Sequence, residues 1–166
     1  MFFRFGAPYF FTTMHALKNT KRAFVLRTGN GHIRKTFTGP KREIRFWNEV
    51  RILRYLNDKG CPFVPKLICI DTPSFTIIVS YAGEPIQSIS EEKLNLIFSK
   101  LEEFGVRHQD QATRNILYNH RAGEFSVIDF EFAELITSCD SYCEITHRLE
   151  ELDEMLACAI PPAAGC

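Results

Sequence analysis

The sequence predicts an α+β domain in which an antiparallel sheet precedes most of the helices. Three observations support this prediction. Short strand-like runs separated by turn residues recur through the first half of the chain, and three stretches have apolar residues at helical spacing. Two further strand-like runs form a hairpin pattern later in the chain. At 166 residues the chain fits a single domain that buries about two-thirds of its unfolded surface.

The first three strands are delimited by turn residues. Residues 8–14 are aromatic and threonine-rich and are expected to form the first strand, followed by a turn at residues 18–21. Residues 23–27 and 32–37 are expected to be the second and third strands. The Asn-Gly pair in the turn at residues 28–31 is a strong signal that these two strands form a hairpin.

Two groups of opposite charge lie on faces that the pattern predicts to be buried. Lys35 shares one face of its strand with Ile33 and Phe37, because side chains alternate along a strand. A helix is expected over residues 43–57, with Glu49 inside its apolar stripe. The other members of that stripe are Phe46, Leu53 and Leu56. An unpaired buried charge is costly, so the sequence predicts an ion pair between Lys35 and Glu49; a glutamate at the edge of a wide stripe is the alternative.

The next part of the chain continues with strands expected at residues 63–70 and 74–81 and a loop at residues 82–85. A second helix is expected to begin at Ser88, because Ser88 and Glu91 match the S-x-x-E capping box. Its buried stripe is Leu94, Ile97, Leu101 and Phe104, and Gly105 lies just past its end. A third helix, capped by Ser141, is expected before Pro161.

Residues 106–132 contain the groups on which the functional prediction depends. Five of them can hold a metal ion, a phosphate or a proton, and their layout allows them to converge: His108, Asp110, Asn115, Asp129 and Glu131. Asp110 lies in a polar loop that leads into a predicted hairpin. The sequence therefore predicts a polar site at the open end of that hairpin.

The register of the hairpin brings two of these groups together. If Tyr118 pairs with Phe125 across the polar connection, Asn115 lies opposite Ile128, and Asp129 follows at the same end. Neighbouring strands are about 4.8 Å apart. The Asn115 amide and the Asp129 carboxylate can therefore reach one cation.

The pattern HQD-x4-N at residues 108–115, followed by IDFE at residues 128–131, resembles the catalytic loop and metal-binding segment of the protein-kinase-like superfamily. The acidic ending is similar to that of the aminoglycoside- and choline-kinase-like branch. Residues 47–53 resemble the kinase helix that carries the ion-pairing glutamate, and residues 32–35 resemble the strand that carries the nucleotide-binding lysine. The resemblance covers roughly residues 20–135.

This resemblance implies a two-lobed, protein-kinase-like fold in one domain spanning residues 1–166. The N-terminal lobe, an antiparallel sheet with one helix, is expected over about residues 8–81, and the hinge over about residues 82–87. A reduced helical C-terminal lobe is expected over about residues 88–160, without the peptide-docking helices of large protein kinases.

The resemblance also implies residue roles, with ATP and Mg²⁺ as cofactors. The catalytic residues are Asp110, as base or positioning group for the acceptor hydroxyl, together with Lys35 and Glu49. Asn115 and Asp129 correspond to the metal ligands. The predicted nucleotide-binding residues are Lys35, Tyr81, Ala82, Gly83, Asn115 and Asp129.

The expected function is transfer of the γ-phosphoryl group of ATP to a hydroxyl on a protein Ser or Thr or on a small molecule. The alternative is a pseudokinase or nucleotide-binding scaffold that acts through protein–protein interaction. One departure from the family favours that alternative: residues 15–20, where a glycine-rich phosphate loop is expected, contain no glycine. Lys18, Lys21 and Arg22 could substitute as point charges.

A third possibility is a hydrolase with a transition metal on His108, Asp110 and Asp129. H-x-D alone is weak evidence for such a site, and this interpretation gives Asn115 and Lys35 no role. His108 is better explained as a structural residue that supports the loop.

The basic residues are concentrated at the N-terminus. Residues 1–42 contain nine Lys and Arg and no Asp or Glu, whereas the rest of the chain contains 11 basic and 20 acidic residues. A solvated face and a positive lobe folded over phosphates both explain this asymmetry. Nucleic-acid binding ranks below both, because no known binding module accompanies the charge.

Two remaining features bear on location. No apolar run approaches the roughly 18 residues of a membrane span. The six cysteines form no CxxC pair, which is typical of reduced thiols. A cytoplasmic location is therefore expected, with the nucleus as the alternative.

Overall fold

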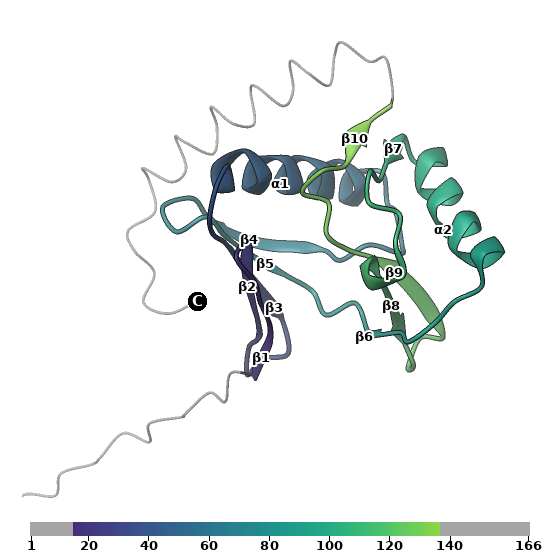
Figure 1. Cartoon of the computed structure of the whole chain (residues 1–166), viewed down its shortest axis with the longest axis horizontal. Coiled ribbons are helices and arrows are strands. Elements are labelled where there is room, and N and C mark those ends of the chain that lie inside the picture. Colours follow the sequence, from purple (N-terminus) through teal and green to yellow (C-terminus); the bar gives the residue numbers. More distant parts are fainter. Residues whose placement is uncertain (1–14, 137–166) are drawn as a thin grey trace, which may run out of the picture.

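The computed structural model describes residues 15–136 as an α+β arrangement in which all strand pairs are antiparallel. Figure 1 shows helix α1 (Arg42–Asp58) lying along the main sheet, whereas helix α2 (Glu91–Glu103) lies beside the later strands. The strand expected at residues 8–14 and the helix expected from Ser141 lie outside the described residues.

The main sheet has five strands in the order β1-β2-β3-β5-β4. Their bounds are β1 His15–Asn19, β2 Ala23–Arg27, β3 Ile33–Phe37, β4 Leu67–Asp71 and β5 Thr76–Val79. The predicted hairpin of β2 and β3 is confirmed. The Gly31 amide closes its turn by donating to the Thr28 carbonyl at 2.9 Å, and Gly31 has a φ of 84°, which glycine adopts without steric cost.

The expectation of a loop over residues 15–20 is wrong. Residues 15–19 form β1, which pairs with β2, and the turn is confined to residues 20–22. Thr20 shapes this turn, because its Oγ1 accepts hydrogen bonds from the amides of Arg22 and Ala23 at 3.2 and 3.1 Å. The Thr20 hydroxyl thus stabilises a turn that is shorter than the loop expected from the sequence.

β4 and β5 are shorter than the strands predicted at residues 63–70 and 74–81. Pro65 has no amide proton, so the hydrogen-bonded ladder cannot extend far before β4. Phe75 has a φ of 49°, the left-handed conformation of a turn. β5 therefore begins only at Thr76.

α1 confirms the helix predicted over residues 43–57. The apolar members of its predicted stripe are fully buried: Phe46, Leu53 and Leu56. Glu49 is buried on the same face, at 4% exposure. The ring of Phe46 packs edge-on against Phe37 of the sheet and Phe75 of the β4–β5 turn. These aromatic contacts fix the helix on the sheet.

α2 begins two residues later than predicted, because Ser90 and not Ser88 caps it. The Ser90 Oγ accepts a hydrogen bond from the Lys93 amide at 3.3 Å. Ile89 and Leu94, on either side of this cap, both pack against the core, and apolar residues at these two positions fix the entry of a chain into a helix. The helix ends as predicted before Gly105, which has a φ of 85°. Its most buried residues are Ile97, Phe98 and Leu101, with Leu94 and Phe104 partly buried.

The later strands form two small sheets. One has the order β6-β8-β9, with β6 Glu84–Pro85, β8 Ile116–Asn119 and β9 Glu124–Val127. The other pairs β7 Val106–Arg107 with β10 Glu134–Leu135. Tyr118 lies opposite Phe125, so the predicted register of the hairpin is confirmed.

A single hydrophobic core connects these parts. It extends from Phe37 of the main sheet through α1 to Leu101 of α2 and to Ile116 and Val127 of the hairpin. Neither helix in the described part of the chain is long and apolar enough to cross a membrane.

Candidate functional site

A cavity of about 730 Å³ lies between the main sheet and the hairpin β8–β9. Its walls come from strands β1–β3, from the segment between β5 and β6, and from residues at the open end of the hairpin. All eight predicted site residues line it: Lys35, Glu49, Tyr81, Ala82, Gly83, Asp110, Asn115 and Asp129. The fold therefore gathers residues that are up to 94 positions apart in the sequence.

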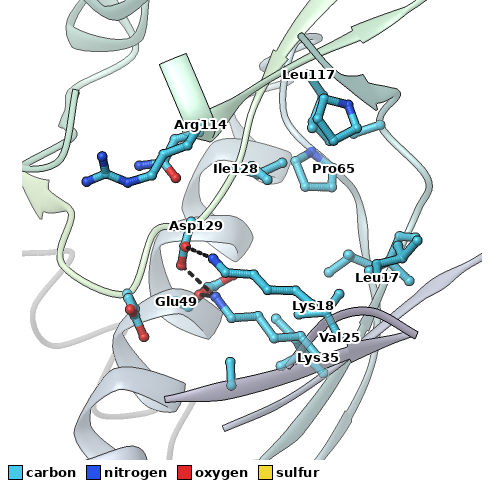
Figure 2. A pocket seen from close by; sticks show the side chains of 18 of the residues that line it. Leu17, Lys18, Val25, Lys35, Glu49, Pro65, Arg114, Leu117, Ile128 and Asp129 are labelled. Atoms are coloured by element: carbon cyan, nitrogen blue, oxygen red, sulfur yellow. Dashed lines mark hydrogen bonds and ion pairs between the residues drawn. The ribbon is translucent and has the colours of Figure 1, made fainter. Parts of the chain in front are cut away.

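The Lys35 ammonium lies between two carboxylates (Figure 2). Its Nζ is 2.6 Å from Glu49 Oε2 and 2.7 Å from Asp129 Oδ1. Lys35 comes from β3, Glu49 from α1, and Asp129 from the residues after β9. The predicted pair of Lys35 and Glu49 is present, and Asp129 shares the same ammonium.

The pKa values of all three groups in this cluster differ from their ordinary values. Burial opposes the charge on Lys35, but Glu49 and Asp129 raise its pKa above the ordinary value. Burial raises the pKa of Glu49 to about 7, against the opposing effect of Lys35. Burial also acts to raise the pKa of Asp129, but Lys35 and, more weakly, Lys18 bring it below its ordinary value. Asp129 is therefore ionised at neutral pH, and Glu49 is the partner that can take up a proton.

Asp129 has a backbone φ of 70°, which is uncommon for a residue other than glycine. Hydrogen bonds on both sides hold it there. The backbone amide of Ile128 donates to the Asn115 carbonyl at 3.0 Å, as the predicted register requires, and the side-chain Nδ2 of Asn48 donates to the Phe130 carbonyl at 3.3 Å. Such conformations persist where the surroundings fix them, often at functional sites.

Asp110 is held by two residues of its own loop. The Asn115 Nδ2 donates to the Asp110 carbonyl at 2.8 Å and to its Oδ2 at 3.0 Å, and an Arg114 guanidinium nitrogen lies 2.5 Å from its Oδ1. Burial acts to raise the pKa of Asp110, but Asn115 and Arg114 lower it below the ordinary value. Both side-chain amide protons of Asn115 are directed at Asp110. The Asn115 Oδ1 is therefore the atom of this side chain that can coordinate a cation.

His108 is a structural residue in this loop, as expected. The Asp110 amide donates to its Nδ1 at 3.1 Å, so the ring proton lies on Nε2, which donates to the Ile128 carbonyl at 3.0 Å. The ring packs between Phe98 and Phe130, with centroids 5.4 Å away on each side. Burial lowers the pKa of His108, which favours its neutral form.

The oxygen donors of the cavity suit Mg²⁺ better than a transition metal. Both ring nitrogens of His108 are used by the backbone, which argues against the hydrolase alternative. Within residues 15–136 no three His, Cys, Asp or Glu side chains are arranged to hold a metal ion. The donors that remain are the Asp129 carboxylate and the Asn115 amide oxygen. Mg²⁺ is commonly bound by one or two protein oxygens together with phosphate oxygens and waters, so this pair fits a cation that arrives with a polyphosphate.

Glu131 lines the same cavity as Asp110, Asn115 and Asp129, but its carboxylate is held in an ion pair of its own. Its Oε2 accepts a hydrogen bond from the buried Arg45 guanidinium at 2.7 Å. The same guanidinium also donates to the carbonyls of Arg22, Thr38 and Pro40. A buried arginine with these partners therefore fixes the Glu131 carboxylate in a charge-assisted hydrogen bond.

Arg45 and Asn48 support the site, although the sequence patterns did not identify either residue as part of it. The Asn48 Nδ2 lies within 3.3 Å of three carbonyls in the turn after Asp129, those of Phe130, Glu131 and Ala133. Arg45 lies one helical turn before Glu49, so its position on the buried face was an available signal. Nothing in the sequence pattern indicated the role of Asn48.

The segment between β5 and β6 is held against β8. The Tyr81 hydroxyl donates to the Glu84 carboxylate, and the Arg27 guanidinium stacks over the Tyr81 ring at 4.3 Å. Gly83 has a φ of 132°, and a Cβ at this position would lie 2.5 Å from the Tyr118 backbone. Only glycine allows this close approach, which brings the backbone of the segment to the edge of the cavity.

The cavity combines an apolar region with a charged one. Val25, Ile77 and Leu117 line the apolar region, and Lys35 and Asp129 form the charged one. No protein-family model matches the sequence, and no curated protein matches it significantly. The function is therefore inferred from the residues of this cavity and their geometry.

Proposed function

We propose that this chain is an ATP- and Mg²⁺-dependent phosphotransferase that transfers the γ-phosphoryl group to a hydroxyl of a protein or a small molecule. The observation that carries the proposal is the convergence of five side chains at one end of one cavity: Lys35, Glu49, Asp110, Asn115 and Asp129. These residue types correspond to the protein-kinase-like motifs that the sequence resembles.

A two-lobed, kinase-like fold is part of the proposal. The main sheet with α1 would form the N-terminal lobe, residues 82–87 the hinge, and α2 with the hairpin β8–β9 the start of a reduced C-terminal lobe. The antiparallel sheet, the single helix packed on it and the cavity beside the hairpin support this assignment.

Each residue then has a distinct role in binding ATP. The backbone of Tyr81, Ala82 and Gly83 would meet the adenine edge, with apolar side chains on either side of the ring. Lys35, kept protonated and oriented by Glu49, would bind the α- and β-phosphates. Asn115 Oδ1 and Asp129 would hold Mg²⁺, which neutralises charge on the phosphates when bound.

Asp110 would position the acceptor hydroxyl. Its lowered pKa keeps the carboxylate ionised, so that it can accept a hydrogen bond or a proton from that hydroxyl. Asn115 contacts Asp110 and would also contact Mg²⁺, which couples the acceptor to the metal. Arg114 pairs with Asp110 while no acceptor is bound and would turn towards an incoming substrate.

A nucleotide-binding scaffold is the second candidate, favoured by one specific observation. Both oxygens of the Asp110 carboxylate are engaged, one by Arg114 and the other by Asn115. A scaffold needs no exposed base, and an enzyme must release Arg114 before the acceptor can bind. The two candidates therefore differ in what Asp110 contributes.

Thermal unfolding with ATP, in the presence and absence of Mg²⁺, tests nucleotide binding. MgATP is expected to stabilise the protein by about 2.7 kcal/mol at a hundredfold excess over its Kd, and Asp129→Asn should remove most of the metal-dependent part. The absence of a shift at millimolar MgATP would contradict the proposal. An equal shift without metal would contradict Asp129 as a ligand.

Release of ADP by the purified protein separates the enzyme from the scaffold. Asp110→Asn should leave MgATP affinity nearly unchanged and reduce turnover by about 100-fold or more, as expected for a lost positioned base. Asp58→Asn, a change of the same kind at the exposed end of α1, is the matched control. Equal turnover by the wild type and Asp110→Asn would favour the scaffold.

A further inference from the structure

Lys18 of β1 reaches across the cavity to the carboxylate of Asp129 (Figure 2). Its Nζ is 3.6 Å from Asp129 Oδ2, while Lys35 is 2.7 Å from Oδ1. Both oxygens of the proposed metal ligand therefore face an ammonium group. The Lys18 contact is longer than a hydrogen bond, and the side chain is 53% exposed, so this second ammonium is held loosely and can move.

Three backbone amides at the neighbouring turn, those of Thr20, Arg22 and Ala23, already have partners within the turn. The amides of Arg22 and Ala23 donate to the Thr20 hydroxyl, and the Thr20 amide donates to the Ala23 carbonyl at 3.0 Å. A glycine-rich loop binds phosphate through free amides of this kind. Because three amides at this turn are already engaged, a side-chain cation is the group that can take their place.

Lys18 is better placed for this than Lys21 and Arg22, the two basic residues of the turn, because its ammonium already faces Asp129. The Arg22 guanidinium lies over the Phe132 ring at 5.6 Å, and the Arg22 carbonyl accepts hydrogen bonds from the Thr38 amide and from Arg45. The Lys21 carbonyl packs directly against Gly39, where a Cβ would lie 2.4 Å from the carbonyl oxygen. These contacts anchor the turn, whereas the long Lys18 side chain retains its freedom on an edge strand.

We propose that Lys18 is a polyphosphate-binding residue that rests on Asp129 in the nucleotide-free protein and transfers to the phosphates when ATP and the metal bind. In the free state its ammonium stands at Asp129 Oδ2, where the divalent cation would bind. The phosphates offer it a second anion, and its departure frees Asp129 for the metal. The inference rests on the proposed function and adds to it that metal and nucleotide enter together.

The first test compares the affinity for ATP, ADP and adenosine by calorimetry. Lys18→Gln is expected to weaken ATP binding by about tenfold, as for the loss of one charge-assisted contact. ADP binding should weaken less, and adenosine binding should not change. Lys18→Arg keeps the charge and should retain ATP affinity to within about threefold. Lys66→Gln, which removes an exposed lysine outside the cavity, is the matched control.

The second test measures binding of Mn²⁺ alone by electron paramagnetic resonance, without nucleotide. Lys18→Gln should bind Mn²⁺ about threefold more tightly or better, because a competing positive charge has been removed. The same variant thus gains affinity for the metal and loses affinity for ATP. A general loss of structure would lower both, and circular dichroism verifies the fold; if Lys18→Gln does not fold, Lys18→Ala removes the same charge.

The outcomes separate this inference from the proposed function. If the wild type binds no ATP, both are overturned. If the wild type binds MgATP and Lys18→Gln binds ATP and Mn²⁺ with the same affinities, only the role of Lys18 is overturned. Equal losses for ATP and adenosine would also overturn it, because a phosphate contact cannot affect adenosine.

Discussion

At the residue scale, His108 illustrates how a buried side chain fixes the loop that carries Asp110. Its Nδ1 accepts the Asp110 amide and its Nε2 donates to the Ile128 carbonyl, so one ring connects the loop to the strand that leads to Asp129. Only the neutral ring can do both, because protonation of Nδ1 would remove the acceptor. The lowered pKa of His108 agrees with this requirement.

This arrangement predicts a pH dependence with a definite sign. The pKa of His108 is lower in the folded protein than its ordinary 6.5, so the unfolded chain binds more protons below that pH. The stability contributed by the neutral ring is therefore present above pH 6.5 and lost as pH falls through the folded-state pKa. Nitrogen chemical shifts of labelled histidines should show His108 titrating below 6.5, with its proton on Nε2. A titration at or above the ordinary value would contradict it.

At the element scale, α1 holds the turn that follows Asp129. Arg45 pairs with Glu131, and Asn48 donates to carbonyls on either side of it. The same helix carries Glu49. One element therefore positions both the partner of Lys35 and the turn after Asp129, the proposed metal ligand. Replacement of Glu131 leaves the buried Arg45 charge without its carboxylate, which is costly.

A double-mutant cycle on Arg45 and Glu131 should therefore show strong coupling. Glu131→Gln is expected to reduce the free energy of unfolding by about 3 kcal/mol, and the coupling between Arg45→Met and Glu131→Gln should exceed about 1 kcal/mol. Urea unfolding gives both quantities. The exposed pair of Glu102 and Arg107, 2.9 Å apart, is the control and should show coupling below about 1 kcal/mol. Additive effects at Arg45 and Glu131 would show that the buried pair does not hold the turn.

At the scale of the whole molecule, the continuous core makes the main sheet and the later elements depend on each other. Leu101 of α2 and Phe46 of α1 are both fully buried members of one cluster. The cavity lies between these parts, so its geometry depends on their joint packing. One cooperative unfolding transition is therefore expected for the described part of the chain.

The single tryptophan, Trp47 on α1, provides a probe of this cooperativity. Leu101→Ala in α2 should lower the free energy of unfolding by about 2–5 kcal/mol. Because the core is shared, Trp47 fluorescence and far-UV circular dichroism should show the same displaced transition. Leu96→Ala, on the same helix but 48% exposed, should change stability little. A Trp47 transition unaffected by Leu101→Ala would contradict a shared core.

The sequence by itself determined most of the local elements and which candidate site residues face the core. Alternation placed Lys35 on the buried face of β3, helical spacing placed Glu49 in the stripe of α1, and the hairpin composition fixed Asn115 opposite Ile128. These inferences succeed because strand and helix geometry repeats over a few residues and is visible in local patterns. The pairing of Lys35 with Glu49 followed because two buried opposite charges require each other.

Only the tertiary structure decided which partners each polar group takes over long distances. Glu131 lines the cavity with the other acidic groups, but its partner, Arg45, lies 86 residues earlier and was not predicted. Lys18 was assigned to a loop, but β1 carries it across the cavity to Asp129. Contacts of this kind depend on carbonyls and charges that the folded backbone brings together, and no local pattern encodes them.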